Sequence, residues 1–307
     1  MKVGIILVLV KSKINKILLW IVVTLAFLAC RKNDISRNVS QLPFSSPQPV
    51  NVSGYSNQIM EPFLSRDGSV LFFNNWNHPS VVTNLHYANR VDDLNFIYQG
   101  ELSGANTEDL EGVATLDASG KLYFVSTRNY DENFSTIYRG DFANGTVSNV
   151  ELVSGISLEQ AGWINFDVEV SEDGEFLFTV DGLYDQNGGP YESNLVVAAK
   201  LGNGFERLVS QSIVQNVNSV ELEYAACISS DMLELYFTRV DAPLTAESIP
   251  QIYVGTRSST SEPFREPYRI EEITGFVEGP TISPDGQIIY YHKKVNGLFK
   301  LYMVRKE

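Results

Sequence analysis

The stretch PTISPDGQIIYY, residues 280–291, places a sharp turn signal between two strand-like segments. A short apolar segment runs into Ser-Pro-Asp-Gly and is followed by two isoleucines and two tyrosines. Proline suits the second position of a type I turn, and glycine accepts the left-handed backbone that follows it. Aromatic and β-branched residues favour a pleated, half-buried strand. The stretch therefore predicts a β-hairpin.

Four earlier segments repeat this pattern at even spacing. They are PFLSRDGSVLFF (62–73), ATLDASGKLYFV (114–125), VEVSEDGEFLFT (168–179) and AACISSDMLELYF (225–237). The turn position falls at Gly68, Gly120, Gly174, Met232 and Gly286, so successive copies lie 52, 54, 58 and 54 residues apart. A Cβ is costly at positive φ, so we expect a different turn in the copy that carries methionine.

Further strand-like segments follow each hairpin. A third segment occurs in every copy: NLHYANRV (84–91), STIYRGDF (135–142), NLVVAAKL (194–201), QIYVGTRS (251–258) and LFKLYMVR (298–305). A fourth occurs in four copies: NFIYQGEL (95–102), VSNVELVS (147–154), RLVSQSIV (207–214) and PYRIEEIT (267–274). Four strands in a repeat of about 50 residues are typical of a β-propeller blade.

The last repeat has no fourth segment of its own. We expect QPVNVS (48–53), near the N-terminus, to supply it and to close the ring. Closure leaves only short, protected sheet edges. The sequence therefore predicts an all-β fold, a five-bladed β-propeller of four-stranded blades in one domain over residues 47–307.

The repeated Ser-x-Asp-Gly turn followed by a Leu/Ile-aromatic strand resembles the WD-like repeats of TolB-type propellers. The resemblance covers nearly the whole chain after residue 47. It implies a propeller domain, although TolB-type domains usually have six blades and this chain has five repeats. Several glycoside hydrolase families also use five-bladed propellers, so fold analogy does not decide the function.

The N-terminus reads as a targeting segment and is set apart from the fold. Residues 1–16 carry four lysines and no acid, and ILLWIVVTLAFLA, residues 17–29, is an unbroken apolar run. Thirteen residues are short for a bilayer span but suit the apolar region of a signal peptide. An uncleaved membrane anchor is the alternative.

The tetrapeptide FLAC, residues 27–30, resembles the lipobox of bacterial lipoproteins, with Ala29 as the small residue before the cysteine. The resemblance implies a signal peptide over residues 1–29, removed by cleavage after Ala29, and lipid attachment at Cys30. Several acyl chains would hold the protein stably on a membrane. We therefore expect a lipoprotein of the bacterial cell envelope, on the outer membrane at its periplasmic or surface side, with residues 30–46 as a flexible tether.

Charge and residue types limit the other function classes. Removal of the signal peptide changes the formal net charge from −14 to −18, which disfavours nucleic acid as a partner. Cys227 is then the only cysteine besides Cys30, so no internal disulfide is expected, and its apolar neighbours favour a buried thiol. The three histidines lack metal-ligand spacing, and no phosphate-binding loop or dinucleotide motif is present. The sequence predicts neither a metal nor a cofactor.

The loops that join strand two to strand three, and one blade to the next, share one face and are long. The opposite face carries only the tight turns. Functional groups concentrate on loops held by a rigid scaffold, so we expect a site on the long-loop face. Aromatic residues there are ligand-binding candidates: Trp76, Tyr130, Trp163 and Tyr184.

Acidic residues recur on the inner strands, near the expected channel mouth. By alternation, the candidates on the channel face are Glu61, Glu111, Asp167 and Glu223, together with Glu169. Glu278 is one residue out of register and is left outside this cluster. Three roles stay open: structural acids bound by backbone amides, binding of a sugar, peptide or cation, or paired-carboxylate catalysis.

These observations favour a non-catalytic binding or scaffolding module for a protein, peptide or glycan partner. The alternative is a glycan-active hydrolase that uses Glu61, Glu111 and Asp167, since glycoside hydrolysis requires two carboxyls, one with a raised pKa. A purely structural envelope component is a third possibility.

Overall fold

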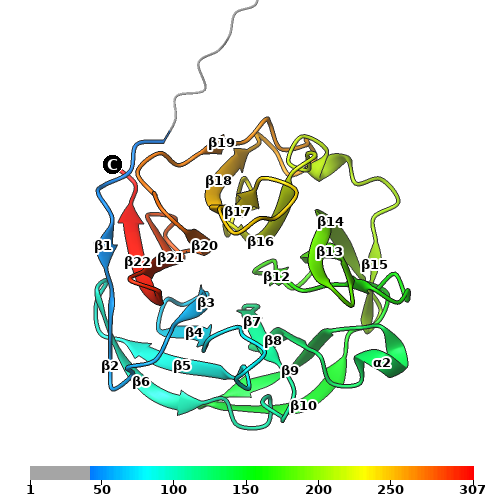
Figure 1. The fold of residues 1–307 in the computed structure, drawn as a ribbon, viewed down its shortest axis with the longest axis horizontal. Helices are drawn as coiled ribbons and strands as arrows, with labels where there is room; N and C mark the ends of the chain where they lie inside the picture. Colours follow the sequence, from blue (N-terminus) through cyan, green and yellow to red (C-terminus); the bar gives the residue numbers. More distant parts are fainter. Residues whose placement is uncertain (1–41) are drawn as a thin grey trace, which may run out of the picture. The chain divides into compact units, whose positions relative to one another are not determined.

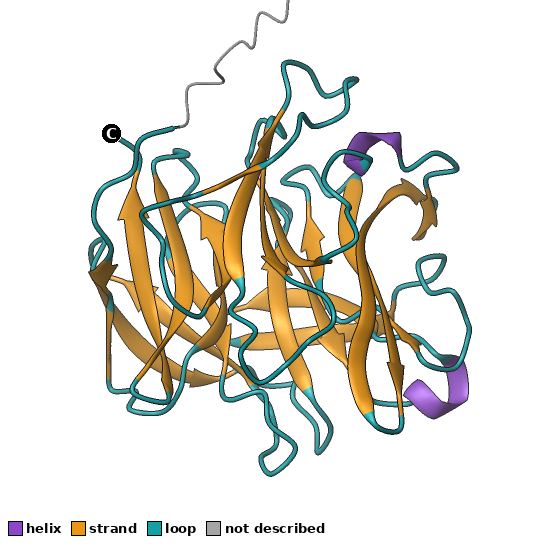
Figure 2. Ribbon diagram, turned by 45° about the horizontal axis from the view of Figure 1, so that its top comes forward, coloured by secondary structure: helices purple, strands orange, loops and turns teal. Residues whose placement is uncertain are grey.

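Five small sheets surround a central axis in the computed structural model, which describes residues 42–307 (Figure 1). The predicted signal peptide, Cys30 and most of the predicted tether lie outside the described residues. Figure 2 shows the strands running between two faces on which the loops gather. The five-bladed β-propeller expected from the repeats is confirmed.

Each blade begins at the central axis with its innermost strand or strands and extends outward. Blade 1 consists of β3 (Met60–Leu64), β4 (Val70–Asn74), β5 (Leu85–Arg90), β6 (Asn95–Glu101) and β2 (Asn51–Ser53). Blade 2 consists of β7 (Glu111–Leu116), β8 (Lys121–Ser126), β9 (Ile137–Ala143) and β10 (Thr146–Leu152). Blade 3 consists of β11 (Trp163–Ile164), β12 (Val168–Val170), β13 (Phe176–Asp185), β14 (Gly188–Leu201) and β15 (Gly204–Arg207).

The last two blades follow the same order. Blade 4 consists of β16 (Leu222–Ile228), β17 (Glu234–Val240), β18 (Gln251–Thr256) and β19 (Tyr268–Arg269). Blade 5 consists of β20 (Val277–Ile282), β21 (Ile288–Val295), β22 (Leu298–Arg305) and β1 (Gln48–Pro49). The described residues also contain the short helices α2 (Tyr130–Asn133) and η1 (Ser212–Val214). Neither has the length and apolar character needed to cross a membrane.

The outer strands of blades 3 and 4 differ from the prediction. In blade 4 the expected strand 267–274 is only the two-residue β19. The segment 207–214 was expected to be a strand, but β15 ends at Arg207 and η1 follows. Side-chain amides replace the missing pairing, because Gln211 Oε1 accepts from the Val197 amide at 2.8 Å and Gln211 Nε2 donates to the Val197 carbonyl at 3.0 Å. Residues 181–193 of blade 3 were expected to form a loop, but in the structure they belong to the long hairpin of β13 and β14.

The N-terminal segment closes the ring as predicted, but it serves two blades. β1 pairs antiparallel with β22, with Gln48 opposite Met303. The chain then continues into β2, which pairs parallel with β6 of blade 1. Phe44, assigned to the tether by the sequence analysis, is buried and bridges to Lys306.

The turn at Met232 matches the turns of the other copies, so the expectation of a different turn was wrong. Met232 has φ +60°, and its amide donates to the Ser229 carbonyl at 2.8 Å, as the Gly286 amide donates to Ser283. The Ser229 hydroxyl donates to Asp231 Oδ1 at 2.6 Å and accepts from the Glu234 amide. These bonds offset the backbone strain of a Cβ at positive φ.

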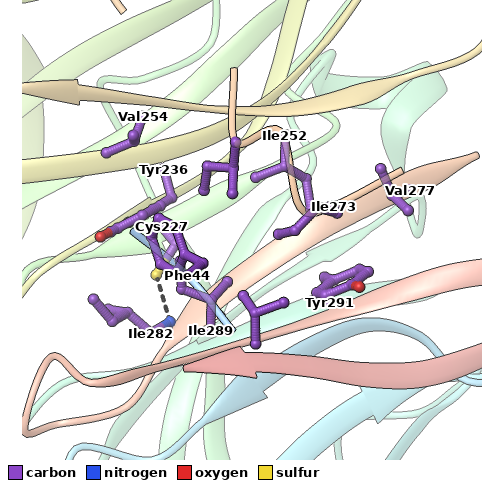
Figure 3. Packing of buried hydrophobic residues seen from close by; sticks show 12 residues of the cluster. Phe44, Cys227, Tyr236, Ile252, Val254, Ile273, Val277, Ile282, Ile289 and Tyr291 are labelled. Carbon is purple, nitrogen blue, oxygen red and sulfur yellow. Dashed lines mark hydrogen bonds between the residues drawn. The ribbon is translucent and has the colours of Figure 1, made fainter. Parts of the chain in front are cut away.

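The aromatic pairs of the second strands fill the spaces between blades. Phe72 packs in the cluster between blades 1 and 2, whereas the next residue, Phe73, packs between blades 5 and 1. Alternation sends successive side chains to opposite faces of a blade, so one strand seals two interfaces. Figure 3 shows the cluster between blades 4 and 5, where the Ile282 amide donates to Cys227 Sγ at 3.3 Å. Cys227 is buried, as predicted, and burial raises the pKa of its thiol.

Candidate functional site

A cavity of about 360 Å³ opens at the axis on the long-loop face. All five blades contribute to it, and much of its wall is apolar or aromatic. Its lining includes Met60, Phe166, Tyr184, Tyr224, Leu244 and Phe276. Phe166 holds the aromatic wall together, because its ring centroid lies 5.7 Å from that of Tyr184 and 5.9 Å from that of Tyr224.

Three carboxylates line the same cavity: Glu61 of blade 1, Asp167 of blade 3 and Glu278 of blade 5. Glu61 and Asp167 occupy the same place in their repeats, seven residues before the turn glycine. Glu278 lies one position earlier, which is why alternation along the strand leaves it out. The structure therefore unites two predicted acids with one that the sequence analysis set aside.

A bulge in the inner strands explains this departure from simple alternation. The register with the second strand shifts between Met60 and Phe63 in blade 1 and between Glu278 and Thr281 in blade 5. The bulged residues have positive φ, +46° at Glu61 and +61° at Gly279. An extra residue reorients the side chains around it, so consecutive positions can face the same space. A Cβ at Gly279 would lie 2.7 Å from Glu61 Oε2, so this acid requires glycine beside it.

Glu278 is held by a hydrogen-bonded network in the cavity wall. The Tyr224 hydroxyl donates to Glu278 Oε1 at 2.5 Å. His292, fully buried, lies 3.0 Å from Glu278 Oε2 through Nε2, and its Nδ1 accepts from the Glu61 amide at 3.1 Å. Because Nδ1 is an acceptor, the imidazole proton is on Nε2 and is donated to Glu278. The sequence analysis missed this role of His292, for which no local motif exists.

Glu61 and Asp167 have raised pKa values. Burial is the largest cause for Glu61, and the negative charges of Asp167 and Glu278 add to it. Burial also raises the pKa of Asp167, to about 7. Hydrogen bonds from the Ala225 and Val168 amides act in the opposite direction but are outweighed by burial. The Ala225 amide donates to Asp167 Oδ2 at 2.7 Å. The cavity thus holds two carboxyl groups that ionise less readily than ordinary ones.

Glu111 and Glu223 do not line the cavity. Each is fully buried and accepts two hydrogen bonds from the residue four positions earlier. Thr107 donates to Glu111, and Ser219 to Glu223, each from its backbone amide and its side-chain hydroxyl. Each also has an arginine from the second strand of its blade or just beyond it: Arg128 lies 3.1 Å from Glu111, and Arg239 lies 2.8 Å from Glu223. The geometry of these two acids is that of structural ion pairs.

Glu169, the third acid of this kind, closes the channel below the cavity. Arg66, from the turn of blade 1, lies 2.9 Å from Glu169 Oε1 of blade 3. Arg66 Nε also donates to the Leu116 carbonyl of blade 2 at 3.1 Å, and Thr115 donates to Glu169 Oε2 at 2.6 Å. Between this ion pair and the cavity, the channel narrows to a space of about 20 Å³. The cavity is therefore a pocket with a floor rather than a pore.

The predicted aromatic residues are distributed over several places. Tyr184 lines the cavity, and burial raises the pKa of its hydroxyl. Trp76 lines a neighbouring groove of about 350 Å³, while the next residue, Asn77, lines the cavity. Tyr130 and Trp163 lie together away from the cavity lining, with the Tyr130 hydroxyl donating to the Trp163 carbonyl at 3.0 Å.

The acids do not form a metal site by their spacing. In residues 42–307, no group of three His, Cys, Asp or Glu side chains is placed to hold one metal ion. The cavity acids come from blades 1, 3 and 5 and lie close enough for the charges of Asp167 and Glu278 to raise the pKa of Glu61.

No protein-family model matches the sequence, and no curated protein is similar to it at a significant level. Solved structures, in contrast, share its fold. An α-L-arabinofuranosidase from Podospora anserina, solved in complex with cellotriose, is 14% identical with a TM-score of 0.56, over 87% of this chain and 97% of that chain.

Two further solved structures illustrate the range. An exo-β-1,3-galactanase from Phanerochaete chrysosporium, solved with β-1,3-galactotriose, is 12% identical with a TM-score of 0.55, over 84% of this chain and 63% of that chain. TolB from Acinetobacter baumannii is 12% identical with a TM-score of 0.45, and the match spans 82% of this chain but only 56% of TolB. At such identities the similarity shows the propeller fold alone.

Proposed function

We propose that this chain is a ligand-binding propeller whose cavity receives a small molecule or the end of a peptide or glycan. The observation that carries the proposal is the closed-bottomed cavity of about 360 Å³, with an aromatic wall and three carboxylates. Concave, mostly apolar pockets with a few convergent polar groups are the usual form of small-ligand sites. The rigid inter-blade cores behind the inner strands keep this geometry preorganised.

Two leucine positions offer a matched test. Leu244 lines the cavity and is 43% exposed, whereas Leu298 lines the neighbouring groove and is 47% exposed. Tryptophan at either position adds bulk at the surface and leaves the core unchanged. We expect Leu244→Trp to weaken binding of ligands found on glycan arrays or in peptide libraries at least about tenfold, with Leu298→Trp close to wild type.

Equal binding by the two variants would place the ligand elsewhere on the molecule. The absence of any ligand from both libraries for the wild-type protein would count against a binding function for the cavity. Circular dichroism of both variants shows whether the fold is unchanged, so that a loss of binding is assigned to the blocked cavity.

A glycan-active hydrolase is the second candidate, and the raised pKa values of Glu61 and Asp167 favour it. Glycoside hydrolysis needs one carboxyl that holds a proton and a second that acts as base or nucleophile. The fold shared with an arabinofuranosidase and a galactanase shows only that this scaffold can carry such an activity, and it does not support the activity in this chain. Release of reducing ends from any glycan bound on the array, lost in both Glu61→Gln and Asp167→Asn, would replace the binding proposal by this one.

The cellular location is proposed from the sequence: the protein is a lipoprotein of the bacterial envelope, attached to the membrane through Cys30. The lipobox-like FLAC and the lysine-rich, apolar residues before it support this proposal. We expect Cys30→Ala to move the protein from the membrane to the soluble fraction and to abolish labelling by a radioactive or clickable fatty acid. Unchanged fractionation together with an unlabelled wild-type protein would contradict lipid attachment.

A further inference from the structure

The acids of the inner strands fall into two classes according to whether an arginine accompanies them. Each of the three acids outside the cavity lining has one: Arg128 for Glu111, Arg66 for Glu169 and Arg239 for Glu223. The three acids of the cavity have none; within residues 42–307, no lysine or arginine lies within ion-pair distance of them or lines the cavity. Glu278 has only the neutral His292 and Tyr224.

From this contrast we infer that the cavity takes an organic cation, a primary ammonium or guanidinium group with an apolar or sugar stem. The inference rests on the proposed binding function and names the ligand class. Buried charges are paired in folded proteins, and this fold supplies the pair wherever the acid is structural. At the cavity the positive partner would arrive with the ligand.

The walls fit the same chemistry. Phe166, Tyr184, Tyr224 and Phe276 line the cavity, and aromatic faces attract cations. Lys294 illustrates this at the rim, with its Nζ 5.3 Å from the Phe276 ring centroid, although it is not part of the cavity lining. The side chain of Glu61 accepts no hydrogen bond from residues 42–307 in this structure, so its oxygens can accept from a ligand.

Binding of a cation should be coupled to proton release. A positive charge beside Glu61 and Asp167 favours their ionised forms and lowers their pKa values. Since both pKa values are raised without the ligand, binding at neutral pH or below releases protons, and affinity rises with pH up to about pH 7. The other titratable groups that face Glu61 or Asp167 from the elements around them are Glu169, Tyr184, Tyr224, Glu278 and His292.

The test uses isosteric probe pairs on the full-length chain. Benzylammonium is compared with benzyl alcohol, and 6-amino-6-deoxyglucose with glucose, by isothermal titration calorimetry at pH 5, 6, 7 and 8. We expect the ammonium member of at least one pair to bind at least about tenfold more tightly at pH 8 than its neutral partner. Its affinity should fall by up to about tenfold per pH unit below pH 7.

Variants separate a specific site from weak general attraction to an acidic protein. Glu61→Gln should reduce ammonium affinity about tenfold at pH 8, and Asp167→Asn should also flatten its pH dependence. Glu175→Gln, an exposed acid on a turn of the opposite face, should leave affinity unchanged.

Equal binding of the charged and neutral members would overturn the cation inference and leave the binding function intact. Ammonium binding that Glu61→Gln does not change, or that Glu175→Gln weakens equally, would overturn it as well. No binding by any probe, combined with no ligand in the libraries above, would overturn both proposals.

Discussion

Arg66→Met is expected to lower the free energy of unfolding by about 3–5 kcal/mol, measured by urea denaturation at pH 7. Arg66 joins Glu169 to the Leu116 and Val170 carbonyls, so three blades meet at one guanidinium group. Methionine retains much of the apolar stem but leaves Glu169 buried without its positive partner. Removing one member of a buried ion pair is among the few single changes that cost this much.

Two further variants isolate the cause. The double variant Arg66→Met/Glu169→Gln should recover part of the loss, because no uncompensated charge is left in the channel. Lys200→Met breaks an exposed pair with Glu175 and should cost less than about 1 kcal/mol. A loss below about 1 kcal/mol for Arg66→Met itself would mean that the ion pair does not hold the channel closed.

Asp167→Asn should make the protein more stable at pH 8, by about 2–4 kcal/mol, and should have little effect at pH 4. The pKa of Asp167 is raised to about 7 in the folded protein, against about 3.9 for an unfolded aspartate. Between these values the unfolded chain binds fewer protons than the folded one, so wild-type stability falls as pH rises. Asparagine has no proton to lose and keeps an oxygen that can accept from the Ala225 amide.

The difference between wild type and Asp167→Asn, followed by urea denaturation from pH 4 to pH 8, gives the test. Asp241→Asn changes an exposed loop acid and serves as the control, with a difference that stays small at every pH. A constant difference for Asp167→Asn across this range would show that burial does not raise the pKa. A gain in stability at the cost of binding would mark Asp167 as a residue kept for function.

The fold was predictable because its decisive information is local. Each Ser-x-Asp-Gly hairpin specifies itself, and even spacing makes five such hairpins into five blades. The outer strands were less predictable, since Gln211 and Asn218 replace a strand by hydrogen-bonding through their side-chain amides to the backbone of β14. Strand-like residue composition cannot reveal such a substitution.

The site was predictable in part, because the bulges in the inner strands change which side chains face the cavity. Alternation grouped Glu111 and Glu223 with Glu61 and Asp167, because a bulge leaves no clear mark in a single sequence. One signal could have separated them. Glu111 and Glu223 both stand nine residues before the turn position, four residues after a threonine or serine that binds them.

The closure of the ring sets an order on its folding. The Arg305 amide donates to Ser45 Oγ, and the Phe299 amide to Gln58 Oε1, across 260 and 241 residues of chain. During synthesis from the N-terminus, residues 42–50 have no β22 partner until almost the whole chain has been made. Blades can form one after another, but the cavity acids of blades 1 and 5 meet only at the final step. If the cavity binds a ligand as proposed, binding would therefore report that the whole ring has closed.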